Sequence, residues 1–108
     1  MPRKLPQYLR SERRRTGLSQ EDVAVLLGTH EFTLRRYERS NRLPPLETAL
    51  AYEAIFGAPI SELFAGTYRE ISERIRRSAQ LRIESLPLAG NSRRIARRKE
   101  SLHAIATR

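Results

Sequence analysis

The 108-residue sequence contains no cysteine, no tryptophan and only two histidines, His30 and His103. The lack of cysteine excludes disulfides, thiol catalysis and cysteine-based zinc sites, and two histidines are too few for a histidine-rich metal site. No apolar run of roughly 18 residues could span a bilayer, and the basic N-terminus lacks the apolar stretch of a secretory signal. No catalytic Ser, His and carboxylate pattern and no phosphate-binding glycine loop occurs. We therefore expect no enzyme, no cofactor, no metal and no membrane partner.

Positive charge, in contrast, is abundant. Lys and Arg number 21 against 12 Asp and Glu, which gives a net charge of +9. The charge is uneven, because residues 1–17 and 91–108 each carry +5 whereas residues 46–66 carry −3. Such an excess favours a polyanionic partner, with nucleic acid ahead of an anionic membrane surface. The sequence thus predicts a cytoplasmic protein that binds double-stranded DNA.

Glycine and proline divide residues 1–66 into short stretches rich in Arg, Glu, Leu and Ala. These stretches are too long for strands and lack β-branched runs, so they predict helices. The expected helices cover residues 7–16, 19–27, 30–40, 46–56 and 60–64. Ser19 and Asp22 have the spacing of a capping box at the start of the second helix. Five short helices with short connections predict a compact all-α domain.

The second and third expected helices, joined by a turn that contains Gly28, have the outline of a helix-turn-helix. On a helical wheel, Leu34, Tyr37 and His30 face inward. The opposite face carries a phenylalanine and three arginines: Phe32, Arg35, Arg36 and Arg39. An arginine can bind guanine O6 and N7 together, a carboxylate can accept from cytosine N4, and an aromatic ring can pack on a thymine methyl group. The outer face therefore has the chemistry of a base-reading surface.

From this chemistry we predict four base-contacting residues: Arg36 and Phe32 first, then Glu31 and Arg35. Arg39 and Arg42 lie toward the C-terminal end of the helix and are expected to contact phosphate. Plainer interpretations stay open. Glu31 and Arg35 are four residues apart and could form only an exposed ion pair, while Phe32 could fold back onto the N-terminal arm. The arginines could also be a merely solvated face.

An ordered series of short motifs runs through the expected helices: Leu18-Ser19-Gln20-Glu21-Asp22-Val23-Ala24, Leu27-Gly28, Thr33-Leu34-Arg35-Arg36-Tyr37-Glu38, Pro44, Leu46-Glu47-Thr48, Phe56-Gly57 and Ser61-Glu62-Leu63-Phe64. In this series, residues 18–64 closely resemble the lambda-repressor-like (Cro and XRE) family of helix-turn-helix DNA-binding domains. The resemblance covers about half of the chain, and the first helix extends it to about residue 7. It implies a five-helix DNA-binding domain.

The resemblance also implies roles for single residues. Three residues stand at the family's usual base-reading positions: Glu31, Phe32 and Arg36. Four stand at positions that contact phosphate: Gln20 at the start of the second helix, and Arg39, Asn41 and Arg42 after the third. Arg13 and Glu38 match a family ion pair that links the first helix to the third. The wheel angle of Glu38, about 40° from the inward-facing Leu34, agrees with partial burial of its carboxylate.

The chain departs from the family pattern at both ends of the third helix. His30 stands where the family usually has a capping serine or threonine, so Thr29 is the expected cap. Ser40 stands where a glycine commonly ends the helix, and Asn41 is the expected left-handed residue. Because Glu31 and Phe32 also replace the frequent polar readers, the family's operator sequences do not carry over to this chain.

Charge and pattern divide the chain into four parts: a basic N-terminal arm (1–6), the helix-turn-helix domain (7–66), a helical extension (67–90) and a basic tail (91–108). One face of the extension carries an apolar stripe: Tyr68, Ile71, Ile75, Ala79, Ile83 and Leu86. This stripe could form a homodimer or pack back on the five-helix domain. The tail has five basic residues that could contact phosphate or a protein partner: Arg93, Arg94, Arg97, Arg98 and Lys99.

These features predict a sequence-specific DNA-binding transcriptional regulator of bacterial or phage type, working as a dimeric repressor. One alternative is an antitoxin that binds its own promoter and neutralises a toxin protein through the C-terminal extension. Another is a protein-interaction adaptor whose arginines bind an acidic protein surface. The operator sequence, the regulated genes and any effector do not follow from the sequence.

Overall fold

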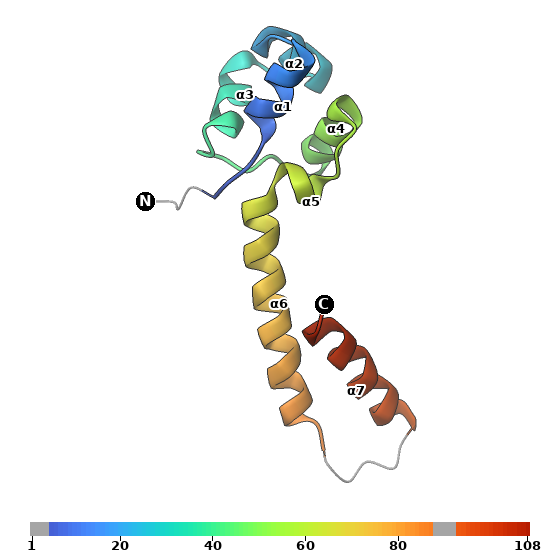
Figure 1. Cartoon of the computed structure of the whole chain (residues 1–108). Helices are drawn as coiled ribbons and strands as arrows, with labels where there is room; N and C mark the ends of the chain where they lie inside the picture. The colour runs from blue at the N-terminus through green and yellow to red at the C-terminus, as the bar shows by residue number, and fades with distance from the viewer. Residues whose placement is uncertain (1–4, 88–92) are drawn as a thin grey trace. The chain divides into compact units, whose positions relative to one another are not determined.

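A computed structural model of the chain describes residues 5–87 and 93–108 (Figure 1). Within these ranges the regular secondary structure is entirely helical: α1 (Leu9–Thr16), α2 (Gln20–Leu27), α3 (Glu31–Glu38), α4 (Leu46–Phe56), α5 (Ile60–Leu63), α6 (Ala65–Ser85) and α7 (Arg93–Ala106). The chain divides into a first unit, Met1–Tyr68, and a second unit, Arg69–Arg108. The expected all-α architecture with a helical C-terminal extension is therefore confirmed.

In the first unit, α1 to α5 form one group of short helices (Figure 1). Their buried residues form one core with an aromatic centre. Tyr52 of α4 is fully buried. Its ring stacks on Phe56 at a centroid distance of 5.9 Å and meets Tyr37 and Phe64 edge-on, each at 6.4 Å. Aromatic pairs in these geometries add stability beyond the area that they bury. Tyr37 anchors the inner face of α3 in this core, and the opposite face of α3 is exposed to solvent.

The helix boundaries agree with the sequence pattern where the signals are local. Helix α4 covers the expected residues 46–56, and Ser19 caps α2 as predicted. The Asp22 N–H donates to Ser19 Oγ at 3.0 Å, and the Ser19 N–H donates back to Asp22 Oδ2 at 2.9 Å. Helix α1 begins at Leu9 rather than at residue 7, and α3 ends at Glu38 rather than at residue 40.

The predicted start of α3 is wrong at the cap. Gly28 has a left-handed φ of 71°, and the Thr29 N–H donates to the Ala24 carbonyl at 3.0 Å. Both residues therefore serve to end α2, and the first residue with extended backbone is His30. His30 is the N-cap and makes no side-chain capping bond. Because it precedes the helix, the wheel angle does not apply to it, and its side chain is exposed rather than inward-facing.

The predicted end of α3 is also corrected. The left-handed residue is Ser40, with φ 59°, rather than Asn41. A non-glycine residue in this conformation is strained, unless local hydrogen bonds support it. Ser40 Oγ accepts from Gln7 Nε2 at 3.3 Å and donates to the Leu5 carbonyl at 3.4 Å. Contacts from a distant part of the chain thus hold the turn.

Backbone hydrogen bonds join the segment before α1 to the end of α5 and to the start of α6. The Tyr8 N–H donates to the Leu63 carbonyl at 2.9 Å, and the Gly66 N–H donates to the Pro6 carbonyl at 2.8 Å. A Cβ atom on Gly66 would lie 2.6 Å from Pro6 Cδ, so this approach requires glycine. Helix α6 begins at Ala65, two residues before the expected extension. The described part of the expected N-terminal arm therefore packs against the first unit.

The second unit consists of α6 from Arg69 onward and α7, which lies beside the C-terminal part of α6 (Figure 1). Of the predicted apolar stripe, Ala79 and Leu86 are buried, whereas Ile71 and Ile75 are 44% and 45% exposed. Most of the expected chain break at residues 87–91 lies outside the described residues. No helix in the described part of the chain is long and apolar enough to cross a membrane.

Candidate nucleic-acid interface

The outer face of α3 presents an aromatic ring beside a guanidinium group. Phe32 is 64% exposed, and Arg36, one turn later, is also exposed. The Arg36 Cζ atom lies 5.9 Å from the centroid of the Phe32 ring, which is within the range of a cation–π contact. Keeping an exposed phenylalanine in water is unfavourable, and an arginine beside it suits a surface that meets bases. Two of the predicted base readers thus lie side by side.

Glu31 and Arg35 form the exposed pair that their spacing allows. Arg35 Nη1 lies 3.4 Å from Glu31 Oε2, and both side chains are about 40% exposed, at 39% and 41%. Such pairs contribute only about 0.2–1 kcal/mol. DNA could therefore displace the pair at little cost, and base contacts by these two residues stay a prediction.

The C-terminal end of α3 and the turn after it carry exposed polar groups. Arg39, Asn41 and Arg42 are all solvent-accessible. The Asn41 N–H donates to the Arg36 carbonyl at 3.0 Å, which fixes the turn on the last residues of the helix. The Arg42 Cζ atom lies 6.0 Å from the Tyr37 ring centroid, so the guanidinium group of Arg42 lies close to α3. Three of the four predicted phosphate-contacting residues are therefore grouped along one short stretch.

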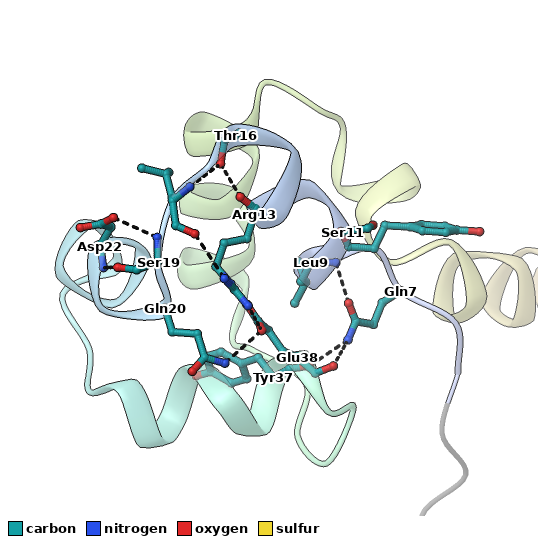
Figure 2. Close-up of polar contacts among 12 residues, drawn as sticks. Gln7, Leu9, Ser11, Arg13, Thr16, Ser19, Gln20, Asp22, Tyr37 and Glu38 are labelled. Atoms are coloured by element: carbon teal, nitrogen blue, oxygen red, sulfur yellow. Dashed lines mark hydrogen bonds and ion pairs between the residues drawn. The ribbon is translucent and has the colours of Figure 1, made fainter.

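Beneath this surface, a buried ion pair joins α1 to α3 (Figure 2). Arg13 Nε donates to Glu38 Oε2 at 2.7 Å, and Arg13 Nη2 donates to Glu38 Oε1 at 3.1 Å. The side chains are only 11% and 3% exposed. The hydrogen bond to Glu38 raises the pKa of Arg13 above its ordinary value, against the opposing effect of burial. This bidentate ion pair fixes the orientation of α3 against α1.

Gln20 joins the same network from α2. Its Nε2 donates to Glu38 Oε1 at 3.3 Å, so the carboxylate binds groups from α1 and α2 at once. Arg13 Nη1 also donates to the Leu18 carbonyl at 3.2 Å, ahead of α2. The structure thus gives Gln20 an internal partner, and its phosphate contact stays a prediction.

Two residues next to this network were not predicted from the sequence. Arg10 lines a shallow groove together with Gln20 and Glu31, at the N-terminal ends of α2 and α3. A weak signal for Arg10 was available, because it lies one helical turn before Arg13 and so on a neighbouring position of the same face. The groove places a cation close to the predicted contacts of both helices.

Gln7 is the second residue that was missed. Its Nε2 donates to the carbonyls of Tyr37 at 3.1 Å and Glu38 at 2.7 Å, and its Oε1 accepts from the Leu9 N–H at 2.7 Å (Figure 2). Helix ends leave backbone carbonyls without internal partners, so Gln7 acts as a side-chain cap for α3. Its partners lie about 30 residues along the chain, and no local sequence pattern reports such a contact.

One buried polar atom near the network has no partner among the described residues, the hydroxyl oxygen of Tyr52. Burial raises the pKa of Tyr52 above its usual value, and the negative charge of Glu38 acts in the same direction. The phenol therefore stays neutral, and Tyr52 serves the core through its ring.

Comparison with known proteins agrees with this geometry. The helix-turn-helix domain family matches residues 5–64. A relative described as the cryptic phage CTXphi transcriptional repressor RstR, from Vibrio cholerae, is 36% identical over 78 residues, which cover 72% of this chain and 67% of the relative. No solved structure matches the chain.

The chain therefore belongs to the helix-turn-helix domain family, and the resemblance of residues 18–64 to XRE-type domains is confirmed. It is a DNA-binding transcriptional regulator, as the sequence predicted.

Proposed function

We propose that this regulator is a sequence-specific repressor that binds duplex DNA as a homodimer and acts in the cytoplasm by occupying its site. Occupation needs no catalytic group. The observation that carries the proposal is the Phe32–Arg36 pair, which lies exposed on the outer face of a helix held by a buried ion-pair network. The related phage protein is described as a transcriptional repressor, which supports the direction of regulation.

In this proposal, α3 enters the major groove. Arg36 and Phe32 contact bases, and Glu31 and Arg35 contact them once their weak mutual pair has opened. Four polar side chains contact the flanking phosphates: Gln20, Arg39, Asn41 and Arg42. Arg10 adds a further phosphate contact, since it shares a groove with Gln20. Phosphate contacts fix the register of the helix on the duplex, and base contacts supply the specificity.

The homodimer is proposed from the exposed apolar face of α6. Ile71 and Ile75 lie one turn apart on one face, and both are almost half exposed. Burying such side chains against a second copy is favourable by the hydrophobic effect. A two-fold dimer would read two half-sites about 34 Å apart, or a multiple of that distance.

Selection on a random duplex library tests the specificity. At about 150 mM salt, where charge-driven binding is screened, we expect an enriched inverted repeat. Arg36→Ala and Phe32→Ala should each lose about 1–3 kcal/mol of preference for the enriched sequence, with little change on other duplexes. Arg77→Ala, which removes an exposed arginine from α6, is the matched control. Retention of DNA without any enriched sequence would contradict a sequence-specific function.

Sedimentation velocity tests the dimer separately. The wild-type chain should sediment as a dimer, and Ile71→Ser combined with Ile75→Ser should sediment as a monomer. Leu81→Ser is the control, because Leu81 is exposed on the same helix at 66% without belonging to the stripe. A wild-type monomer at micromolar concentration, on and off DNA, would reject the homodimer.

A further inference from the structure

The second unit contains a groove in which arginines from both its helices meet. The described residues that line it are Arg82 of α6 and six residues of α7: Arg93, Arg94, Arg97, Arg98, Ser101 and Leu102. No carboxylate is among these lining residues. Guanidinium groups stay charged at any physiological pH, so the groove concentrates about five positive charges.

The spacing of the arginines on α7 produces this arrangement. Arg93 and Arg97 are four residues apart, as are Arg94 and Arg98, so they form two adjacent rows. The two members of a row lie about 6 Å apart along the helix axis, slightly more than one turn. The remaining cation of this stretch, Lys99, lies outside the groove and donates from its Nζ to the Pro87 carbonyl at 3.3 Å. The groove is therefore lined by arginines and does not include every basic residue of α7.

Three of the arginines that line the groove, Arg93, Arg97 and Arg98, are available to bind a ligand. Among the described residues, no salt bridge to a carboxylate involves Arg93, Arg97 or Arg98. Like charges held this close repel one another, and an anion in the groove would remove that repulsion. The groove is therefore suited to a ligand that carries several negative charges.

Two macromolecular ligands with this charge are the phosphate backbone of DNA and an acidic protein segment. A protein segment gains most of its affinity from apolar anchors in pockets, and among the described lining residues Leu102 is the only apolar one. DNA needs no such anchor, because its phosphates bind to arginine by charge and paired hydrogen bonds. The first unit also holds DNA, which raises the effective concentration of backbone around the tethered second unit.

We infer that the α6–α7 groove is a second, sequence-independent binding site for the DNA backbone. The inference rests on DNA binding by the first unit and extends it. Binding at the groove adds affinity for every duplex equally, whereas α3 distinguishes one sequence from another.

The experiment compares two double variants of the full chain with equal loss of charge. Arg97→Gln with Arg98→Gln removes two charges from the groove, and Arg69→Gln with Arg77→Gln removes two exposed charges of α6 outside it. Glutamine keeps a helix propensity close to that of arginine. The probe is a fluorescent duplex of mixed sequence, about three helical turns long, titrated over a range of salt concentrations.

We expect the groove variant to flatten the plot of log affinity against log salt by about 1.8, which corresponds to two phosphate contacts at about 0.9 each. The α6 control should keep the wild-type slope. Arg97→Lys with Arg98→Lys preserves the charge and should also keep it, and circular dichroism reports whether each variant retains its helices. Equal slopes for the groove variant and the wild type would overturn the inference.

Two further outcomes separate the inference from its premises. A wild-type chain that binds no duplex at low salt would contradict DNA binding itself. Loss of binding to poly-glutamate with an unchanged slope on DNA would overturn the inference in favour of an acidic protein partner.

Discussion

The two units of this chain use arginine in opposite ways. In the first unit, Arg13 is nearly buried, and its guanidinium group binds a carboxylate and a carbonyl. In the second unit, Arg97 and Arg98 are exposed and line a groove without a carboxylate. A buried charge must be paired to be tolerated, whereas an exposed charge costs little and stays available. Burial therefore distinguishes an arginine that shapes the fold from one that can meet a ligand.

The same contrast occurs within α3. Glu38 is buried and bound on several sides, and Arg36, two residues earlier, points to solvent beside Phe32. A displacement of two residues turns a side chain by about 200° around the helix. The network on the inner face thus positions the groups on the outer face.

The largest effect is expected from breaking the buried ion pair. Arg13→Ala should lower the free energy of unfolding by about 3–5 kcal/mol, because Glu38 would be left charged and buried without its main partner. Urea unfolding followed by circular dichroism measures the loss. Arg35→Ala is the control, since it removes only the exposed pair with Glu31 and should cost less than about 1 kcal/mol. Equal losses for the two variants would contradict the claim that the buried arginine contributes more to stability than the exposed one.

A smaller effect is expected from Gln7→Ala. This change removes the side-chain donor of the Glu38 carbonyl, whereas the Tyr37 carbonyl keeps the Ser40 N–H, and we expect a cost of about 1–3 kcal/mol. Gln80→Ala removes an exposed amide that donates to Glu84 of the same helix, and its effect should stay within about 0.5 kcal/mol. Urea unfolding of both variants measures the difference, and the idea that Gln7 caps α3 fails if they unfold alike.

The capping box of α2 should appear in the pH dependence of stability. Hydrogen bonds from the Ser19 N–H, and then from the Ser19 hydroxyl, lower the pKa of Asp22 below its ordinary value. A carboxyl with a lowered pKa in the folded state stabilises the protein above its unfolded pKa of about 3.9, and this stabilisation is lost as the pH falls through the folded pKa. The difference in unfolding free energy between the wild type and Asp22→Asn should therefore shrink below about pH 4. Parallel curves across this pH range would contradict the capping role.

The smallest effect is expected from Tyr52→Phe. The Tyr52 hydroxyl is buried without a hydrogen-bond partner among the described residues, so its removal should leave stability within about 1 kcal/mol of the wild type, on the favourable side. Tyr52→Ala is the contrasting variant and should cost about 3–5 kcal/mol, because it removes the central ring of the core. Thermal melts of both variants measure this, and a clear loss in Tyr52→Phe would reveal a buried water bound to the hydroxyl.

Local signals made much of the first unit predictable. The bounds of α4, the Ser19 capping box and the inward positions of Leu34 and Tyr37 follow from propensity and helical periodicity, and the structure confirms each of them. The resemblance to XRE-type domains came from an ordered series of motifs, which the family match supports. These features depend on residues within one or two turns of each other.

Features that depend on distant residues were missed or placed wrongly. Ser40 takes the left-handed conformation because Gln7 and Leu5 bind its hydroxyl, and the sequence around Ser40 favoured Asn41. The cap of Gln7 on α3 depends on the same packing of the N-terminal segment. The arginine groove needed α6 and α7 to come together, so the sequence showed its charges without their arrangement.

The close contact between Gly66 and Pro6 also offers a site for a conditional mutation that destabilises the fold. A methyl group at position 66 would lie 2.6 Å from the Pro6 nitrogen and 2.7 Å from its carbonyl oxygen, in a place where backbone rather than a flexible side chain must move. Domains of this size are stable by only a few kcal/mol, so a moderate strain leaves the folded state populated at low temperature and depleted at high temperature. The substitution Gly66→Ala should therefore give a temperature-sensitive allele. Heating would unfold and inactivate the regulator, although every residue proposed to contact DNA is unchanged.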